Sequence, residues 1–299
     1  GLYNFGNAVL SASGDTKRPL YYLSFAGVLN VLLNLFFVIV CKMGVAGVAV
    51  ASILSQYLSA VLILRVLFKS SAAFGLQLKE LRITPDKAGR ILKIGIPSAF
   101  QYALFAIANL FVQTGVNSFD HVMVEGNSAA ANADPLVYDM MAAFYTACSS
   151  FIAQNYGAKK SDRILKSYLI CLLYSFVVGL VLGVGLYLLR YPFLSLFTSD
   201  TTVVDAGIRR LSIMALSYSV SAFMDCTIAA SRGLGKSIVP TIVVIMGSCV
   251  FRIVWIYTIF AHFRTIQSLY LLYVFSWTIT AIAEIIYFVI VYRKVKPQT

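Results

Sequence analysis

Four ionisable side chains lie within long apolar stretches of this 299-residue sequence: Asp139, Asp225, Arg252 and Glu284. An ionised group at the centre of a bilayer costs about 2.5–3.5 kcal/mol, so each of the four needs a partner or a function. Asp225, in "SVSAFMDCTIAAS", is a candidate for cation coupling, because one desolvated carboxylate can bind either a proton or another cation. Asp139 and Glu284 are further candidates for this role. For Arg252 we expect a structural ion pair with Asp225 or Glu284.

A row of amide side chains occupies the first long apolar stretch of the second half. Gln101, Asn109, Gln113 and Asn117 are separated by multiples of four residues, which places them along one face of a helix. Amides in hydrocarbon must face protein or water, because an unsatisfied polar group there is costly. We therefore expect this face to line a cavity, although hydrogen bonding between packed helices would also account for it.

The following apolar stretch carries a second set of polar and aromatic residues. They are Asn127, Asn132, Asp134, Tyr138, Asp139 and Tyr145. Pro135 is expected to bend this helix near one end, as often happens beside a binding site. The candidates for lining a substrate cavity are thus the four amides above together with Asn132, Tyr138 and Tyr145.

The elements that must position these residues are membrane-spanning helices. Sixty per cent of the residues are hydrophobic and 12% are charged, with a mean hydropathy of +0.83. Soluble domains typically contain about 25% charged residues. Apolar runs long enough to cross a bilayer predict an all-α polytopic membrane protein. The eight predicted spans are 20–40, 45–67, 94–117, 128–156, 167–189, 203–231, 238–260 and 267–292, preceded by a helix stub over 1–13.

The net charge of +12 follows from the predicted topology. One set of loops contains 18 of the 24 Lys and Arg residues and the other set contains 5, with Arg209 and Arg210 counted among the 5. By the positive-inside rule the basic set, including the C-terminus, is expected to be cytoplasmic. This distribution accounts for the positive charge without a nucleic-acid partner.

Two similar loops predict an internal repeat. Residues 11–19, "SASGDTKRP", resemble residues 230–240, "ASRGLGKSIVP", with Gly14 matching Gly233 and Lys17 matching Lys236, both 219 positions apart. Six spans separate the two inter-helix turns, so both lie on the same face of the membrane, as in parallel repeats. We expect two six-helix bundles related by a parallel pseudo-two-fold axis, and the offset predicts about four spans before the first residue.

Other motifs carry no chemistry of their own. "SRGLGKS" lacks the first glycine of a phosphate-binding loop, because Ala230 stands in its place. His121, His262 and the five cysteines have no metal-ligand spacing. The sequence therefore predicts neither an enzyme nor a metal site, and no cofactor other than a coupling ion, H⁺ or Na⁺.

Six stretches spread over nearly the whole sequence carry a family resemblance. They are "GDTKRPLYYLSFAGVLNVLLN" (14–34), "MGVAGVAVASILSQ" (43–56), "ILKIGIPSAFQ" (91–101), "NSAAANA" (127–133), "FIAQNYGAKKSDR" (151–163) and "SRGLGKS" (231–237). In type and order they resemble the multidrug and toxic compound extrusion (MATE) family of cation-coupled antiporters. The resemblance implies two six-helix lobes around a central cavity, which export organic cations and drugs by alternating access.

The resemblance also divides the chain into lobes. Residues 1–67 would be a remnant of the N-terminal lobe, 68–93 a cytoplasmic connector, 94–292 the C-terminal lobe and 293–299 a cytoplasmic tail. Some family members have a coupling carboxylate in the first span of the second lobe, where this sequence has Phe105 and amides.

The family resemblance leads us to expect a monomer in the bacterial inner membrane. A lipid-linked oligosaccharide flippase of the same superfamily is the alternative. Such a flippase should have a more strongly cationic cavity, and Arg252 is taken as the single base within the spans, which disfavours it.

Overall fold

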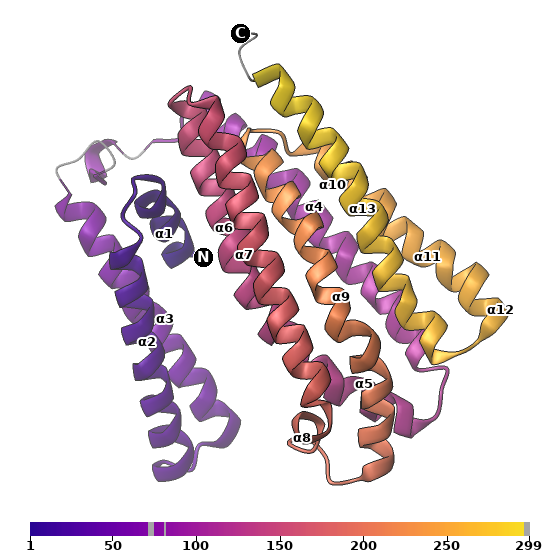
Figure 1. Cartoon of the computed structure of the whole chain (residues 1–299). Helices are drawn as coiled ribbons and strands as arrows, with labels where there is room; N and C mark the ends of the chain where they lie inside the picture. Colours follow the sequence, from indigo (N-terminus) through magenta and orange to yellow (C-terminus); the bar gives the residue numbers. More distant parts are fainter. Residues whose placement is uncertain (71–74, 81, 296–299) are drawn as a thin grey trace. The chain divides into compact units, whose positions relative to one another are not determined.

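The computed structural model describes residues 1–70, 75–80 and 82–295, and these fold almost entirely into helices (Figure 1). The chain forms two compact units, Gly1–Pro85 and Asp86–Thr299. The boundary falls inside the predicted connector 68–93. Residues 71–74 and 81 of that connector, and 296–299 of the predicted tail, lie outside the described residues.

The first unit contains three main helices. They are α1 (Leu2–Ala12), α2 (Lys17–Leu35), which continues as a π-helix over Phe36–Val40, and α3 (Gly44–Lys69), followed by a short 3₁₀ turn at Leu78–Glu80. A small apolar core formed by Leu10, Ile63 and Leu67 joins α1 to α3. Most other large apolar side chains of α2 and α3 are exposed, as expected of helices that lie in lipid.

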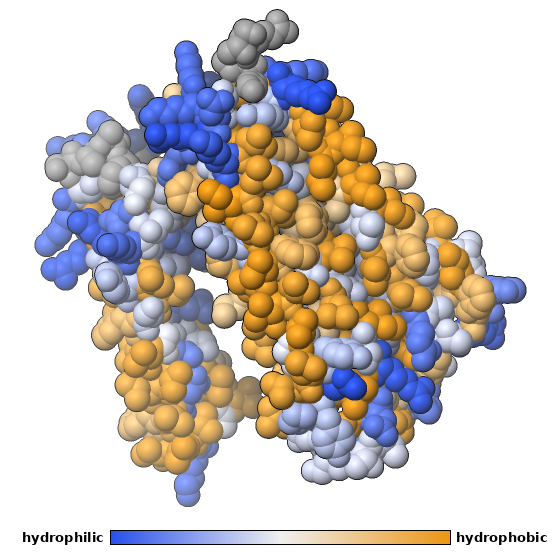
Figure 2. Space-filling view, in the orientation of Figure 1, coloured by the Kyte–Doolittle hydropathy of each residue, from blue (hydrophilic) through white to orange (hydrophobic). Residues whose placement is uncertain are grey.

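The second unit is a bundle of long helices together with several short helical segments. Its elements are α4 (Pro85–Val116), α5 (His121–Ala131), α6 (Ala133–Gly157), α7 (Ser161–Leu188), α8 (Arg190–Leu194), α9 (Thr201–Gly233), α10 (Ile238–Val244), α11 (Phe251–Trp255), α12 (Ala261–Phe263) and α13 (Ile266–Val295). Two π-helical segments, Ile245–Val250 and Ile256–Phe260, join α10, α11 and α12 into one continuous helix. Apolar side chains cover the middle of this bundle and polar ones gather at its ends (Figure 2).

Eight helices in the described part of the chain are long and apolar enough to span a membrane, and they coincide with the eight predicted spans to within a few residues at most ends. The largest departure is at 94–117, where the helix begins nine residues earlier, at Pro85. Proline is favoured in the first turn of a helix because the amide hydrogen it lacks has no partner there. The expected all-α polytopic fold is confirmed.

Helix α9 is the centre of the second unit. Its span is 72% buried, whereas no other span exceeds 39%. It packs against α5, α6, α7 and α13. Small residues allow this close packing, because helices in lipid approach best where side chains are short. Gly183 of α7, for example, lies against the backbone of Ala215 in α9.

The expected bend at Pro135 is a complete break between α5 and α6, located three residues earlier at Asn132. The Asn132 side chain donates hydrogen bonds to the carbonyl oxygens of Ser128 and Ala129, which terminates α5. Pro135 then lies in the first turn of α6, where backbone N–H groups have no helical partner, so proline is tolerated.

The two similar turns have the same geometry, but the second depends on a different glycine from the predicted one. Gly14 and Gly235 have φ values of +93° and +73°, whereas Gly233 is the last residue of α9. In each turn the residue after this glycine donates its N–H to the carbonyl five residues back, from Asp15 to Leu10 and from Lys236 to Ser231. Both are Schellman caps, which need a left-handed residue.

The match of Gly14 with Gly233 is therefore corrected, and 221 residues separate Gly14 from its structural equivalent Gly235. Gly233 is required for a different reason: a side chain there would collide with the Ser149 carbonyl oxygen and Ile152 of α6. The match of Lys17 with Lys236 is corrected as well, because Lys236 directly follows its turn glycine as Asp15 does, whereas Lys17 is the first residue of α2.

The close contact of α7 with α9 gives a first test. Gly183→Ala should destabilise the intact protein by about 1–3 kcal/mol, because the added methyl group would overlap the Ala215 carbonyl oxygen. Gly185→Ala, two residues along α7, meets no atom within 4 Å and should leave stability unchanged or slightly raised. Unfolding in detergent micelles measures the difference, and equal stability of the two variants would contradict the packing.

Candidate functional site

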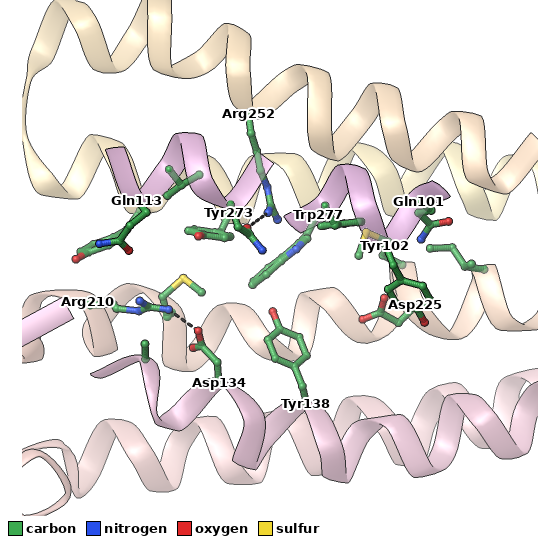
Figure 3. A pocket seen from close by; sticks show the side chains of 18 of the residues that line it. Gln101, Tyr102, Gln113, Asp134, Tyr138, Arg210, Asp225, Arg252, Tyr273 and Trp277 are labelled. Atoms are coloured by element: carbon green, nitrogen blue, oxygen red, sulfur yellow. Dashed lines mark hydrogen bonds and ion pairs between the residues drawn. The ribbon is translucent and has the colours of Figure 1, made fainter. Parts of the chain in front are cut away.

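A cavity of about 570 Å³ lies within the second unit, between α4, α5, α6, α9, α11 and α13 (Figure 3). Three amides of the predicted row, Gln101, Asn109 and Gln113, project into it from α4. Tyr138 and Tyr145 of α6 also line it, as predicted. The cavity therefore brings together side chains that the sequence separates by more than 40 residues.

The remaining predicted lining residues lie elsewhere. Asn117 is exposed just beyond the end of α4, where it accepts a hydrogen bond from Gln113 at 2.8 Å. A row at every fourth residue drifts around an α-helix by about 40° per step, so Asn117 lies about 160° from Gln101. Asn132 is exposed at the α5–α6 break. These two are therefore not part of the cavity lining.

Two of the predicted coupling carboxylates also lie outside the cavity. Asp139 follows Tyr138 and is turned by about 100° around α6, so it is exposed. Glu284 is completely buried within the bundle, and neither of its carboxylate oxygens has a hydrogen-bond partner among the described residues. Asp225 of α9 is the predicted coupling residue that lines the cavity.

Asp225 is half-buried in the wall of the cavity. Within the described residues, no side chain makes a hydrogen bond or ion pair with its carboxylate. Arg232, two helical turns further along α9, interacts electrostatically with Asp225 but donates its hydrogen bond to Gln101 Oε1, at 2.8 Å. The carboxylate of Asp225 is thus free to bind a ligand from the cavity.

A buried polar network occupies the other end of the cavity, beside the α5–α6 break. Arg210 of α9 donates to Asp134 Oδ2 at 2.5 Å and to Asn127 Oδ1 at 2.9 Å. Tyr218 donates to the second Asp134 oxygen at 2.5 Å, and Tyr270 of α13 donates to Asn127 Oδ1 at 3.0 Å. The network links α5, α6, α9 and α13 through groups that would be costly to bury alone.

Arg210 corrects a sequence-based assignment. It was counted with the outer loops, yet it lies ten residues into α9 and is only 6% exposed. An arginine inside a predicted span, with an acid in the first turn of a neighbouring helix, was a sufficient signal to expect a pair. Asp134 was noted as part of the polar wall without a partner.

The predicted ion pair of Arg252 does not form. Arg252 of α11 lies on the cavity wall and donates from Nη1 to Asn109 Oδ1 at 2.8 Å, and neither Asp225 nor Glu284 forms a salt bridge with it (Figure 3). Asp225 of α9 and Glu284 of α13 each interact electrostatically with Arg232 instead.

Comparison with known proteins identifies the family. The family model described as MatE matches residues 97–258, more than half of the chain, including most helices that line the cavity. The chain belongs to the MATE family. The family resemblance noted in the sequence is confirmed.

Curated MATE relatives match at moderate identity. The chain is 33% identical over 164 residues to the probable multidrug resistance protein YpnP of Bacillus subtilis, covering 54% of this chain and 36% of the relative. It is 24% identical over 252 residues to the probable multidrug resistance protein NorM of Thermotoga maritima, covering 79% and 52%. The chain thus spans about half the length or less of these relatives.

A solved MATE structure has the same fold. The outward-facing conformation of a multidrug resistance MATE family transporter of the MOP superfamily matches with a TM-score of 0.91 and 21% identity, covering 99% of this chain and 67% of the other. The match agrees with the predicted MATE-like arrangement of the helices.

The ion pair at the α5–α6 break of this MATE protein predicts strong coupling. Asp134→Asn alone should cost about 3–5 kcal/mol, because it leaves the buried Arg210 charge unpaired. Arg210→Gln alone should cost less, because the Asp134 side chain is 28% exposed. The double variant should recover part of that loss, with a coupling energy above about 1 kcal/mol in an unfolding double-mutant cycle.

The exposed pair Arg90–Asp86 on α4 is the matched control for this cycle. Its side chains are 73% and 64% exposed, so its coupling energy should not exceed about 0.5 kcal/mol. Equal coupling in the two cycles would contradict a structural role for the buried pair.

Proposed function

We propose that this MATE protein is a secondary active transporter, and not an enzyme, that exports amphipathic organic compounds, organic cations among them, in exchange for H⁺ or Na⁺. Both curated relatives are probable multidrug resistance proteins, which supports the export of organic compounds. The observation that carries the proposal is the position of Asp225, a carboxylate without a salt bridge in a cavity lined by aromatic and amide side chains.

The lining suits a flat, partly polar compound. Aromatic side chains from three helices, Phe105, Tyr138, Tyr273 and Trp277, offer ring faces on which a cation or an aromatic ring can lie. The volume of about 570 Å³ is within the range of small-molecule pockets.

Asp225 is the proposed point of exchange. Asp134, the other acid of the lining, is already neutralised by Arg210. One carboxylate cannot bind a coupling ion and a substrate cation with full affinity at the same time, so binding of one favours release of the other. Exchange across the membrane follows if the cavity opens alternately to each side. No further cofactor is part of the proposal.

The orientation follows from charge. The α6–α7 turn, the α9–α10 turn and the end of α13 lie at one end of the second unit (Figure 1) and carry clusters of Lys and Arg. We infer that this end, with the C-terminus, faces the cytoplasm of a bacterial inner membrane. We further propose that the protein acts as a monomer and binds no nucleic acid.

A lipid-linked oligosaccharide flippase has less support. Arg252 is not the single base within the spans, because Arg210 and Arg232 lie in the span Thr201–Gly233 and also line the cavity. The family match and the curated relatives nevertheless support multidrug export.

Efflux of a fluorescent cationic dye tests the proposal. In proteoliposomes containing the intact protein, an imposed proton or sodium gradient should drive dye transport. Asp225→Asn should abolish the dependence on the gradient, because the neutral amide cannot bind the coupling ion. Asp139→Asn is the matched control, since Asp139 is exposed and outside the cavity. Coupled transport that survives Asp225→Asn would overturn the assignment.

A further inference from the structure

The cavity has more positive than negative side chains. Its charged lining residues are Asp134, Arg210, Asp225, Arg232 and Arg252, two acids against three arginines, for a formal charge of +1. Arg210 is paired with Asp134, and Arg232 interacts with Asp225. In the described part of the chain, Arg252 is left as a cavity arginine with no acidic partner.

The contacts of Arg252 are all with neutral groups. Nη1 donates to Asn109 Oδ1 at 2.8 Å and Nε donates to Ser276 Oγ at 3.5 Å. The guanidinium carbon lies 4.6 Å from the ring centre of Tyr273 and 5.2 Å from that of Phe105. These rings stabilise the charge in part and hold the guanidinium plane in place.

One edge of the guanidinium remains available. Nη2 of Arg252 makes no hydrogen bond to an acceptor among the described residues. It is nevertheless accessible to solvent, since it is absent from the set of unpartnered side-chain atoms that are sealed from solvent. The residue as a whole is 2% exposed and lines the cavity, so this edge faces the cavity. In Figure 3 the side chain extends from α11 into the layer that contains Tyr273 and Trp277.

A buried guanidinium without a counter-ion is unfavourable, and an anion supplied by a ligand would offset much of that cost. Carboxylates and phosphates fit a guanidinium edge well, because two parallel N–H groups can donate to two oxygens. The rings that flank Arg252 favour an anion attached to a flat aromatic group.

We propose that Arg252 binds an anionic group of the substrate, so that the preferred compounds are aromatic zwitterions. This inference rests on the proposed transport function and narrows its substrate class. The anionic group would lie at Arg252 and the cationic centre toward Asp225. Tyr138 and Trp277, whose ring centres are 6.2 Å apart, line the same cavity (Figure 3) and would contact the aromatic body.

Binding of two matched dyes to the intact protein in detergent tests the inference without requiring transport. One dye is a rhodamine with a free carboxylate, a zwitterion at neutral pH, and the other is its methyl ester, a simple cation. Fluorescence anisotropy should show that the wild type binds the zwitterion about tenfold or more tightly than the ester. Arg252→Gln should weaken binding of the zwitterion alone and remove this preference.

Two further variants sharpen the result. Arg252→Lys keeps the charge but loses the two-pronged geometry, so it should retain a reduced preference and serves if Arg252→Gln does not fold. Arg209→Gln removes an exposed arginine outside the cavity and should behave as the wild type.

Equal affinity of the wild type for both dyes, no binding of either, or an unchanged preference in the two Arg252 variants would each overturn the inference. Displacement of the zwitterion by short-chain phosphatidylglycerol more readily than by benzoate would do so too, assigning Arg252 to a lipid headgroup. A zwitterion preference without gradient-driven transport would instead overturn only the proposed function. Gradient-driven transport of both dyes with no preference would overturn only the role of Arg252.

Discussion

Asp134 lies in the first turn of α6, directly after the break from α5, and both of its carboxylate oxygens are bound by α9, one by Arg210 and the other by Tyr218. A break in a membrane helix leaves backbone groups unpaired, and hydrocarbon offers no water to satisfy them. Asn132 satisfies two carbonyl oxygens at the break, and the Asp134 network fixes the new helix to the centre of the bundle. The direction in which α6 leaves the break, and with it the position of Tyr138 in the cavity wall, depends on this interaction.

The central, buried position of α9 follows from the same constraint, the lack of water in the hydrocarbon layer. A helix surrounded by other helices in lipid gains little from large apolar side chains, because lipid tails are equally apolar. Small residues instead bring its backbone close to its neighbours, as Gly183 of α7 does at Ala215. The central helix can then carry the costly polar groups, Arg210 near one end and Asp225 near the other, where partners or the cavity receive them.

The cavity therefore has two chemically different regions on a shared aromatic wall. At one, Asp225 presents an unpaired negative charge, and at the other Arg252 presents a positive charge held by an amide and two rings. Charges of opposite sign in one enclosed space discriminate between compounds by where their charges lie, whereas the aromatic rings tolerate variation in the body between them. Broad acceptance of flat compounds and selection by charge are compatible in such a site.

Much of the fold was determined by the sequence alone. Apolar runs long enough to cross a bilayer predicted all eight spans, because the length of an apolar run can be read from a local stretch of sequence. The similarity of two turns indicated a repeat. Local rules also worked for three amides of α4 and two tyrosines of α6, which lie within a few turns of one another on their helices. They failed at Asn117, where a drift of about 40° per step accumulates along α4, and at Asp139, which a single residue step turns by about 100° away from the cavity.

Only the tertiary structure decided which charged side chains pair with one another. Arg210 pairs with Asp134, Arg252 has no acid, and Glu284 is buried without a hydrogen bond, although the sequence showed all four residues. The glycine of the second turn likewise proved to be Gly235, because the residue that adopts positive φ depends on where α9 ends. Pairing depends on the depth and rotation of several helices at once, and these are set by their mutual packing, which no single stretch of sequence contains.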